Sequence, residues 1–242
     1  MWNGQKSTAI VVGLLLSVLL PTVLEPAVRT SVYGEDTTNE SERAIRASRV
    51  LEELIRAEDN EIPAALLDRA RAVAVIPHVV KGAFIVGGRF GKGLVSKRLN
   101  DGSWGAPLFV EISGGSVGYQ IGAEATDLVL VFIEDEGIDA LLEDRLRIGV
   151  DATAAAGPLG RNAGIGTNIT LDAAIYSYSR SKGLFAGVAL DGAVLSPDVS
   201  ANRSVYGEGF DKDQILNSRD VPAIVAPFVE AIEKHTPETP TD

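Results

Sequence analysis

A serine set among glycines is the first pattern in this sequence that could carry out chemistry. Gly114-Gly115-Ser116-Val117-Gly118 matches G-x-S-x-G, in which a strand–turn–helix presents a nucleophilic serine to a histidine later in the chain. The residues after Ser116 alternate between apolar and polar types, as in a strand, and the later histidine is His235, close to the C-terminus. We therefore predict a turn that enters a strand, and a hydrolase that uses Ser116 stays an alternative.

Metal ligands and thiol nucleophiles are scarce in this chain. Its 242 residues include no cysteine and two histidines, which excludes disulfides and thiolate metal sites. The acids Glu134-Asp135-Glu136 and Asp139 follow one another closely, and we interpret them as the first turn of a helix, where the helix dipole favours negative charge. We predict that the protein is not an enzyme and has no catalytic residue, metal or cofactor.

Anion binding is better supported, because basic residues are concentrated locally in a chain with a formal net charge of −11. The stretch between Asp68 and Asp101 contains no acid, whereas residues 124–151 carry nine. Within the basic stretch, Gly87-Gly88-Arg89-Phe90-Gly91-Lys92-Gly93 lacks the spacing of a phosphate-binding loop, so we interpret it as a glycine-rich hairpin turn. Exposed N–H groups beside Lys and Arg can still hold an anion. The acidic total disfavours nucleic acid as a partner.

A second candidate is the stretch YSYSRSKGLFAG, from Tyr176 to Gly187. With a period of two, its serines lie on one face, which predicts a tight, hydrogen-bonded contact with a neighbouring element. Tyr176, Tyr178, Arg180 and Lys182 lie on the other face. Basic residues attract anionic lipid head groups, and interfacial tyrosines place their rings in the apolar zone. The two tyrosines belong either to such a site or to the core.

The elements that must position these residues can be read from periodicity. An apolar stripe at helical spacing follows Asn39, and Pro63 begins a second, short helix. A helix near 136–144 interrupts a succession of strands, and a last helix follows Pro222. This order predicts an α+β domain with a mostly antiparallel sheet, curved or closed into a barrel. We expect strands near 72–76, 83–90, 94–99, 108–112, 117–126, 128–133, 148–156, 169–180 and 184–190.

The N-terminal residues have a targeting pattern. Lys6 precedes the apolar run Ala9–Leu20, whose twelve residues suit the core of a signal peptide better than a membrane span. Residues 1–34 then form a signal peptide, or, if the run extends to Leu24, an uncleaved anchor. Either alternative predicts a periplasmic or extracellular domain associated with a membrane surface. We expect a loose linker at 35–40, one domain at 41–235 and a disordered tail at 236–242.

Five segments carry a family resemblance: KGAFIVGGRFGKGLVSKR, GGSVGYQIGAEATDLVLVF, GPLGR, AIYSYSRSKGLFAGVALDG and NRSVYG. In this order they resemble the SYLF-domain family, also described as the lipid-binding or actin-binding Ysc-type domain, over about Ser48 to Gly207. The resemblance implies phospholipid binding, with phosphoinositides as ligands of eukaryotic members and actin filaments as partners of fungal members, and no enzymatic activity. With its export pattern, this chain resembles the bacterial exported branch, in which we do not expect actin as a partner.

Two functional hypotheses follow. The first is a peripheral membrane protein that binds anionic phospholipid head groups, and the second is a cell-envelope scaffold that binds an acidic partner. In the first, Leu184 and Phe185 insert into the membrane. The residues predicted to bind the head groups are basic positions in the segments above, and they are Lys81, Arg89, Lys92, Lys97, Arg98, Arg180 and Lys182.

Overall fold

The structure is a computed structural model that describes residues 36–56, 62–83, 87–116, 122–159, 172–181 and 184–236. The contacts within the chain divide it into two units, Met1–Ser31 and Val32–Asp242, and all described residues belong to the second. The expected signal segment 1–34 therefore lies outside the described residues. In the described part of the chain, no helix is both long enough and apolar enough to span a membrane.

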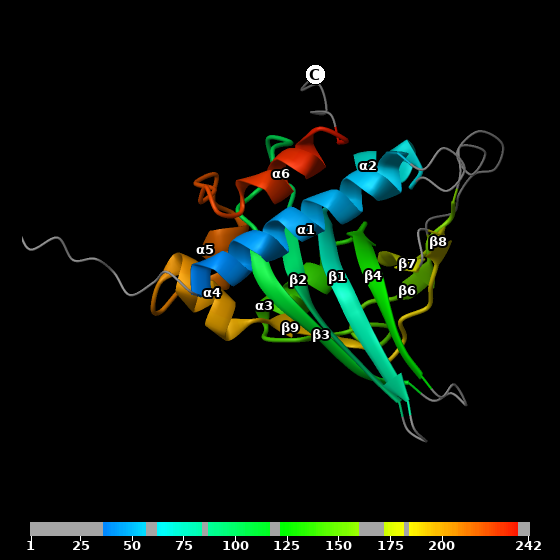
Figure 1. Ribbon diagram of the computed structural model, residues 1–242. Helices are drawn as coiled ribbons and strands as arrows, with labels where there is room; N and C mark the ends of the chain where they lie inside the picture. The colour runs from blue at the N-terminus through cyan, green and yellow to red at the C-terminus, as the bar shows by residue number, and fades with distance from the viewer. Residues whose placement is uncertain are drawn as a thin grey trace, which may run out of the picture. The chain divides into compact units, whose positions relative to one another are not determined.

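A nine-stranded sheet forms the centre of the described unit (Figure 1). Its strand order is β5-β9-β3-β2-β1-β4-β7-β6, and β8 also pairs with β7. All pairings are antiparallel except that of β6 with β7, and the sheet curls strongly, so the predicted fold class is confirmed. The strands are β1 Ala72–Ala83, β2 Gly87–Lys97, β3 Leu108–Ser116, β4 Gly122–Phe132, β5 Leu146–Arg147, β6 Ala154–Ala156, β7 Ile175–Ser181, β8 Leu184–Gly187 and β9 Val194–Pro197.

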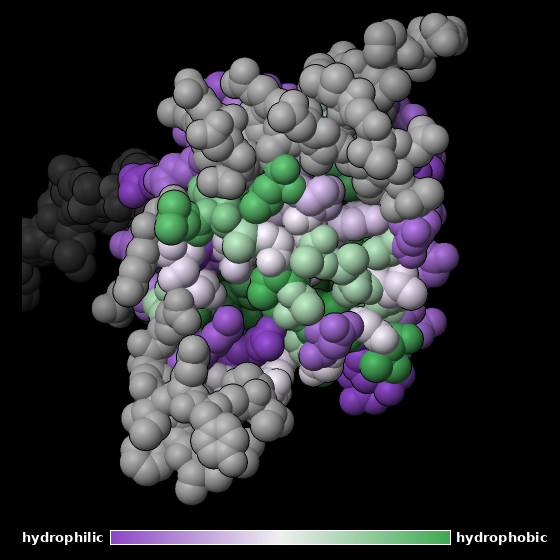
Figure 2. All heavy atoms as spheres, turned by 90° about the vertical axis from the view of Figure 1, so that its right-hand side faces the viewer, coloured by the Kyte–Doolittle hydropathy of each residue, from purple (hydrophilic) through white to green (hydrophobic). Residues whose placement is uncertain are grey.

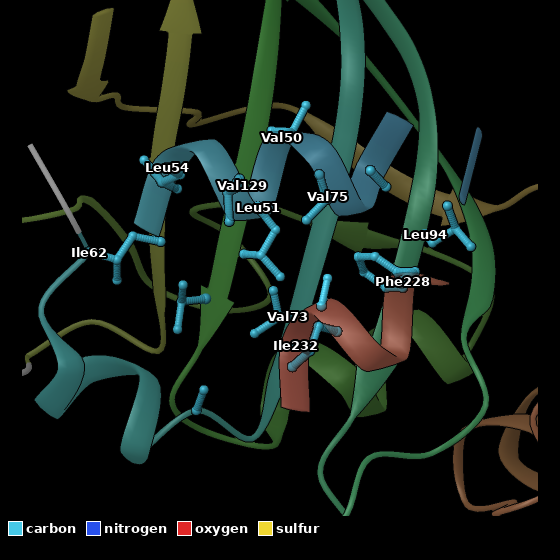
Figure 3. Close-up of a cluster of buried hydrophobic side chains, with 14 of the residues drawn as sticks. Val50, Leu51, Leu54, Ile62, Val73, Val75, Leu94, Val129, Phe228 and Ile232 are labelled. Carbon is cyan, nitrogen blue, oxygen red and sulfur yellow. The ribbon is translucent and has the colours of Figure 1, made fainter. Parts of the chain in front are cut away.

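Helices cover both faces of this sheet. Helices α1 and α6 lie across one face, where Leu51, Val75 and Phe228 meet in a common core (Figure 3). On the other face, Ile138 of α3 packs with Ile112 of β3 and their neighbours in a second core. The expected N-terminal, inserted and C-terminal helices are thus present. The helices are α1 Asp36–Arg56, α2 Ala64–Asp68, α3 Glu136–Leu142, α4 Val199–Tyr206, α5 Lys212–Leu216 and α6 Ala226–Glu233.

Several expected boundaries need correction. Helix α1 begins at Asp36, so residues 36–40 are helical and not a loose linker, in keeping with the favourable placement of acids near a helix N-terminus. Of the strand expected at 148–156, only β6 at Ala154–Ala156 forms, and the residues before it make a turn in which Gly149 has a φ of +83°. At the other end of the unit, Thr236 is buried and its hydroxyl accepts a hydrogen bond from the indole of Trp104 (2.8 Å), so it is not part of a disordered tail.

A bulge in β1 brings this strand close to glycines of β2. The register between β1 and β2 shifts between Val75 and Val80. A Cβ added to Gly93 would lie 2.1 Å from the carbonyl oxygen of Val75, so β2 needs glycine to approach the bulged strand.

The segment 87–93, expected as a hairpin turn, forms the first part of β2. Because successive side chains of a strand alternate, Arg89 and Lys92 lie on opposite faces of the sheet.

Gly93→Ala is expected to destabilise the fold by about 3 kcal/mol, the upper end of the usual cost of overpacking, because the clash is with backbone atoms. Urea unfolding should show a lower midpoint with an unchanged slope. Gly115→Ala in β3 is the matched control, since a Cβ there meets no atom within 4 Å. Equal midpoints for the two variants would contradict the close approach of β1 and β2.

Candidate functional site

The predicted head-group residues do not form one cluster. Lys92 lies beside α1 and α4, whereas Lys97 and Arg98 lie near the end of β2. Arg180 lies on β7, and Lys182 lies outside the described residues. Lys81 and Arg89 form a pair in the β1–β2 hairpin. Each location has different surroundings, which decide whether the cation is available to a ligand.

Lys92 is neutralised within the protein. Its Nζ lies 2.8 Å from Oδ2 of Asp198, which also accepts a hydrogen bond from Nη1 of Arg43 at 2.9 Å. Burial alone would raise the pKa of Asp198, but hydrogen bonds from Lys92, Ser200, the N–H of Ala201 and Arg43 hold it at about 2. This carboxylate therefore joins α1, β2 and the first turn of α4, and Lys92 has a structural role.

Arg98 is also held by the protein. Its guanidinium donates hydrogen bonds to the carbonyl oxygens of Asp68 (2.9 Å) and Leu67 (3.2 Å), which lie at the end of α2, and it lies 5.1 Å from the ring centre of Trp104. Burial lowers the pKa of Arg98, and the charge of Asp68 partly offsets this effect. Both terminal nitrogens thus serve the fold, as a C-terminal helix cap does.

A pocket of about 510 Å³ beside Arg98 does not select anions. Its charged lining residues are of both signs, so attraction and repulsion of a phosphate nearly cancel. Lys97, the neighbour of Arg98 in sequence, has its Nζ 3.5 Å from Oδ1 of Asn217. The charged residues that line the pocket are Asp68, Arg69, Arg71, Arg98, Asp101 and Glu134.

Arg180 connects four elements. It forms ion pairs with Asp127 of β4 (2.7 Å) and with Glu53 of α1, and its guanidinium lies 5.7 Å from the ring centre of Phe185 of β8. Asp127 also accepts a hydrogen bond from the backbone N–H of His78 (2.9 Å), at the bulge of β1. Phe185 is only 8% exposed and belongs to the core, which corrects the expectation that its ring lies at the surface.

The tyrosines of the same strand are core residues. Tyr176 and Tyr178 are buried, and the hydroxyl of Tyr178 donates to the carbonyl oxygen of Pro158 (3.1 Å) while burial raises its pKa. On the opposite face, the buried hydroxyl of Ser177 donates to the carbonyl oxygen of Ala155 in β6 (3.2 Å). The predicted hydrogen-bonded contact of the serine face is confirmed at Ser177.

The side of the molecule that contains β7 and β8 exposes apolar surface (Figure 2). Hydrophobic side chains reach the surface in the middle of this view, and hydrophilic ones lie along its right-hand margin. From β8, Leu184 is 71% exposed. Its insertion into a membrane therefore stays a prediction.

The end of the β1–β2 hairpin differs from the other locations. Lys81 and Arg89 are register partners on one face of the sheet, and the adjacent partners Val80 and Phe90 lie on the opposite face, 42% and 49% exposed. Here β1–β4 extend beyond the edge of α1 (Figure 1). In the part of the chain that the structure describes, neither Lys81 nor Arg89 has an ion pair. We call these four residues the sheet tip.

The C-terminal half of the chain matches a known protein family. The family model of Ysc84, described as "Las17-binding protein actin regulator", matches residues 113–235, which is just over half of the sequence. The chain belongs to the Ysc84 family. This membership confirms the resemblance found in the sequence, whereas the assignment to a bacterial branch stays a prediction.

Curated relatives of this Ysc84-family chain include larger proteins. It is 35% identical to Protein YSC84 of Saccharomyces cerevisiae over 179 residues, which is 72% of this chain and 38% of that protein. It is also 35% identical to LAS seventeen-binding protein 3 of the same species, over 72% of this chain and 39% of the relative. For SH3 domain-containing YSC84-like protein 1 of Rattus norvegicus, the identity is 33% over 210 residues, 81% of this chain and 62% of the relative. The chain thus spans about four to six tenths of these relatives.

These descriptions of the Ysc84 family concern binding and regulation, not a reaction. The hydrolase alternative is not supported by the fold, because Ser116 ends β3 and the next described element is the strand β4, whereas the motif places its serine between a strand and a helix. The described residues contain no group of three or more His, Asp and Glu side chains that could hold a metal ion.

The sequence analysis predicted the basic residues of the sheet tip but not its apolar residues, Val80 and Phe90. Their signal is a mirrored pair of dipeptides, Val80-Lys81 and Arg89-Phe90, in two strands joined by a short connection. In the antiparallel pairing of β1 with β2, Val80 lies opposite Phe90 and Lys81 lies opposite Arg89. The dipeptides alone could not reveal that Val80 and Phe90 are exposed, since that depends on where α1 ends over the sheet.

Proposed function

We propose that this Ysc84-family chain binds anionic phospholipid surfaces through the sheet tip. The observation that carries the proposal is the exposed pair Val80 and Phe90 directly beside the basic pair Lys81 and Arg89. Both pairs lie where the strands extend beyond α1, so the end of the sheet can enter the interface edge-on (Figure 1). Leu184 of β8 is a further candidate for contact with the apolar zone.

The expected strength is that of weak, reversible binding. A basic residue near an anionic leaflet contributes about 1 kcal/mol, less at high salt. Because Val80 and Phe90 are each roughly half exposed, their burial contributes about 1 kcal/mol apiece, half of what a fully buried side chain gives. The four residues together supply about 4 kcal/mol, which suits a peripheral protein and not a permanent anchor.

Vesicle co-sedimentation tests this function. The chain should sediment with vesicles of phosphatidylcholine and phosphatidylserine, much less with phosphatidylcholine alone, and less as salt is added. Equal binding to both vesicle types, or binding to neither, would contradict the proposal. The expected export through residues 1–34 belongs to the same proposal and would place the tip at an extracytoplasmic membrane surface.

A protein partner is the second candidate, favoured by the family description of Las17 binding and actin regulation. The cations Lys81 and Arg89 would then meet acidic residues of that partner instead of phosphates. This candidate predicts no sedimentation with vesicles and specific crosslinking of one protein to the sheet tip. Sedimentation with actin filaments in the absence of lipid would identify actin as that partner.

A further inference from the structure

We propose that Arg89, with Lys81 beside it, forms a binding site for a single phosphate group on the sheet face opposite Val80 and Phe90. The inference deepens the proposed function, because it names the chemical group that the sheet tip recognises. It rests on that function only for the source of the phosphate, which is either a lipid head group or a free phosphate.

The guanidinium of Arg89 is incompletely satisfied. Its Nε and Nη1 are buried from solvent, and neither has a hydrogen-bond partner among the described residues. Burial lowers the pKa of Arg89, and no acidic group in the described part of the chain offsets this shift. Buried N–H groups in native proteins nearly always have an acceptor, and a buried charge is normally paired. Since no described residue supplies this acceptor, we infer that a bound ligand does.

Other basic residues of the predicted site have acceptors within the protein, although Nε of Arg98, like Nε of Arg89, is buried without a partner among the described residues. Lys92 meets Asp198, Arg180 meets Asp127, and both terminal nitrogens of Arg98 meet carbonyl oxygens. The fold thus supplies acceptors where a cation has a structural role. At Arg89 it supplies burial without an acceptor, as expected of a ligand site.

The register of the sheet places a second cation and an open neighbour beside Arg89. Across the strands the order is Glu124 of β4, Lys81 of β1, Arg89 of β2 and Gly114 of β3. Like charges on directly opposed residues repel, so Lys81 and Arg89 are more stable with an anion between them. Arg89, with two buried nitrogens that lack an acceptor among the described residues, is the principal ligand.

The shape of the site and the geometry of the guanidinium favour a phosphate group as the ligand. Gly114 offers no side chain, and a Cβ there would lie 3.0 Å from Cα of Ala193, so the turn before β9 closes that side of the site. A guanidinium presents its donors in one plane and matches two oxygens of a phosphate, which a lysine ammonium cannot do. Arginine and lysine are therefore not interchangeable at position 89.

The arginine side-chain N–H spectrum of the ¹⁵N-labelled chain, titrated with inorganic phosphate, tests this site. The Nε–H resonance that is missing in Arg89→Lys should shift and saturate in the wild type, and Phe90→Ser should retain this shift. Arg203→Lys is the matched control, because Arg203 pairs with Glu208 on the surface of α4. A resonance of Arg89 that does not move with phosphate would overturn the inference, and urea midpoints would verify that each variant is folded.

Vesicles of phosphatidylcholine and phosphatidylserine separate the two proposals. Phosphate binding at Arg89 without vesicle binding would support the phosphate site, with free phosphate as its source, and would contradict the membrane function. Vesicle binding that Arg89→Lys leaves unchanged, together with no response to phosphate, would support the membrane function and overturn the phosphate site. If both hold, Arg89→Lys should reduce binding to these vesicles several-fold while Arg203→Lys leaves it unchanged.

Discussion

Replacing Asp198 with alanine is expected to destabilise the fold by about 3–5 kcal/mol, because removing one partner of a buried ion pair leaves the other charge without compensation. Asp198 is buried, and it pairs with Arg43 of α1 and Lys92 of β2 while it caps α4 through the N–H of Ala201. The alanine variant loses both ion pairs and the cap. Urea unfolding should show a large fall in the midpoint.

Two comparisons isolate the cause. Glu42→Ala removes an exposed ion pair with Arg46 on α1 and should leave the midpoint nearly unchanged. The pKa of Asp198 in the folded protein, about 2, lies below the ordinary value, so its contribution is complete above pH ~4 and is lost as the pH falls through about 2. This acid-sensitive part of the stability should be absent from Asp198→Ala. An unchanged acid profile in the variant would contradict the role of the carboxylate.

The double variant Val80→Ser, Phe90→Ser is expected to weaken binding to phosphatidylserine-containing vesicles about thirtyfold. It removes two apolar contacts of about 1 kcal/mol each, and 1.4 kcal/mol corresponds to a factor of ten. Since both side chains are roughly half exposed in the unbound protein, the fold should lose little stability. Co-sedimentation over a range of lipid concentrations measures the change.

Two exposed apolar residues elsewhere serve as controls for this variant. Val199→Ser on α4, where valine is 53% exposed, should leave vesicle binding unchanged. Leu184→Ser on β8 tests the insertion expected from the sequence. If Leu184→Ser abolishes binding while the double variant does not, the lipid-binding surface lies at β8 and not at the sheet tip.

Much of the fold could be predicted from the sequence because its signals are local. Alternating residues marked the strands, the apolar stripe after Asn39 marked α1, and Pro222 marked the approach to the last helix, α6. The bulge of β1 could not be predicted in this way. It depends on how close β2 approaches, and only the three-dimensional register explains why Gly91 and Gly93 are needed there.

The candidate site was harder to predict, because the availability of a charge is a tertiary property. The stretch between Asp68 and Asp101 looked basic since it contains no acid, yet Lys92 meets Asp198, 106 residues later. Likewise Arg180 looked free within its own segment but meets Asp127 and Glu53. The sequence identifies the candidate cations. The fold is needed to show that Lys92 and Arg180 pair with acidic residues, whereas the buried nitrogens of Arg89 have no acceptor among the described residues.

A fluorescent label at position 90 tests the central claim most directly. The chain contains no cysteine, so Phe90→Cys gives one attachment point for a polarity-sensitive dye, and Val199→Cys gives a matched control on α4. On addition of vesicles of phosphatidylcholine and phosphatidylserine, the label at position 90 should shift to the blue and brighten, and the label at position 199 should not change. Emission at position 90 that stays unchanged while the protein sediments with the vesicles would contradict the proposal that the sheet tip enters the membrane.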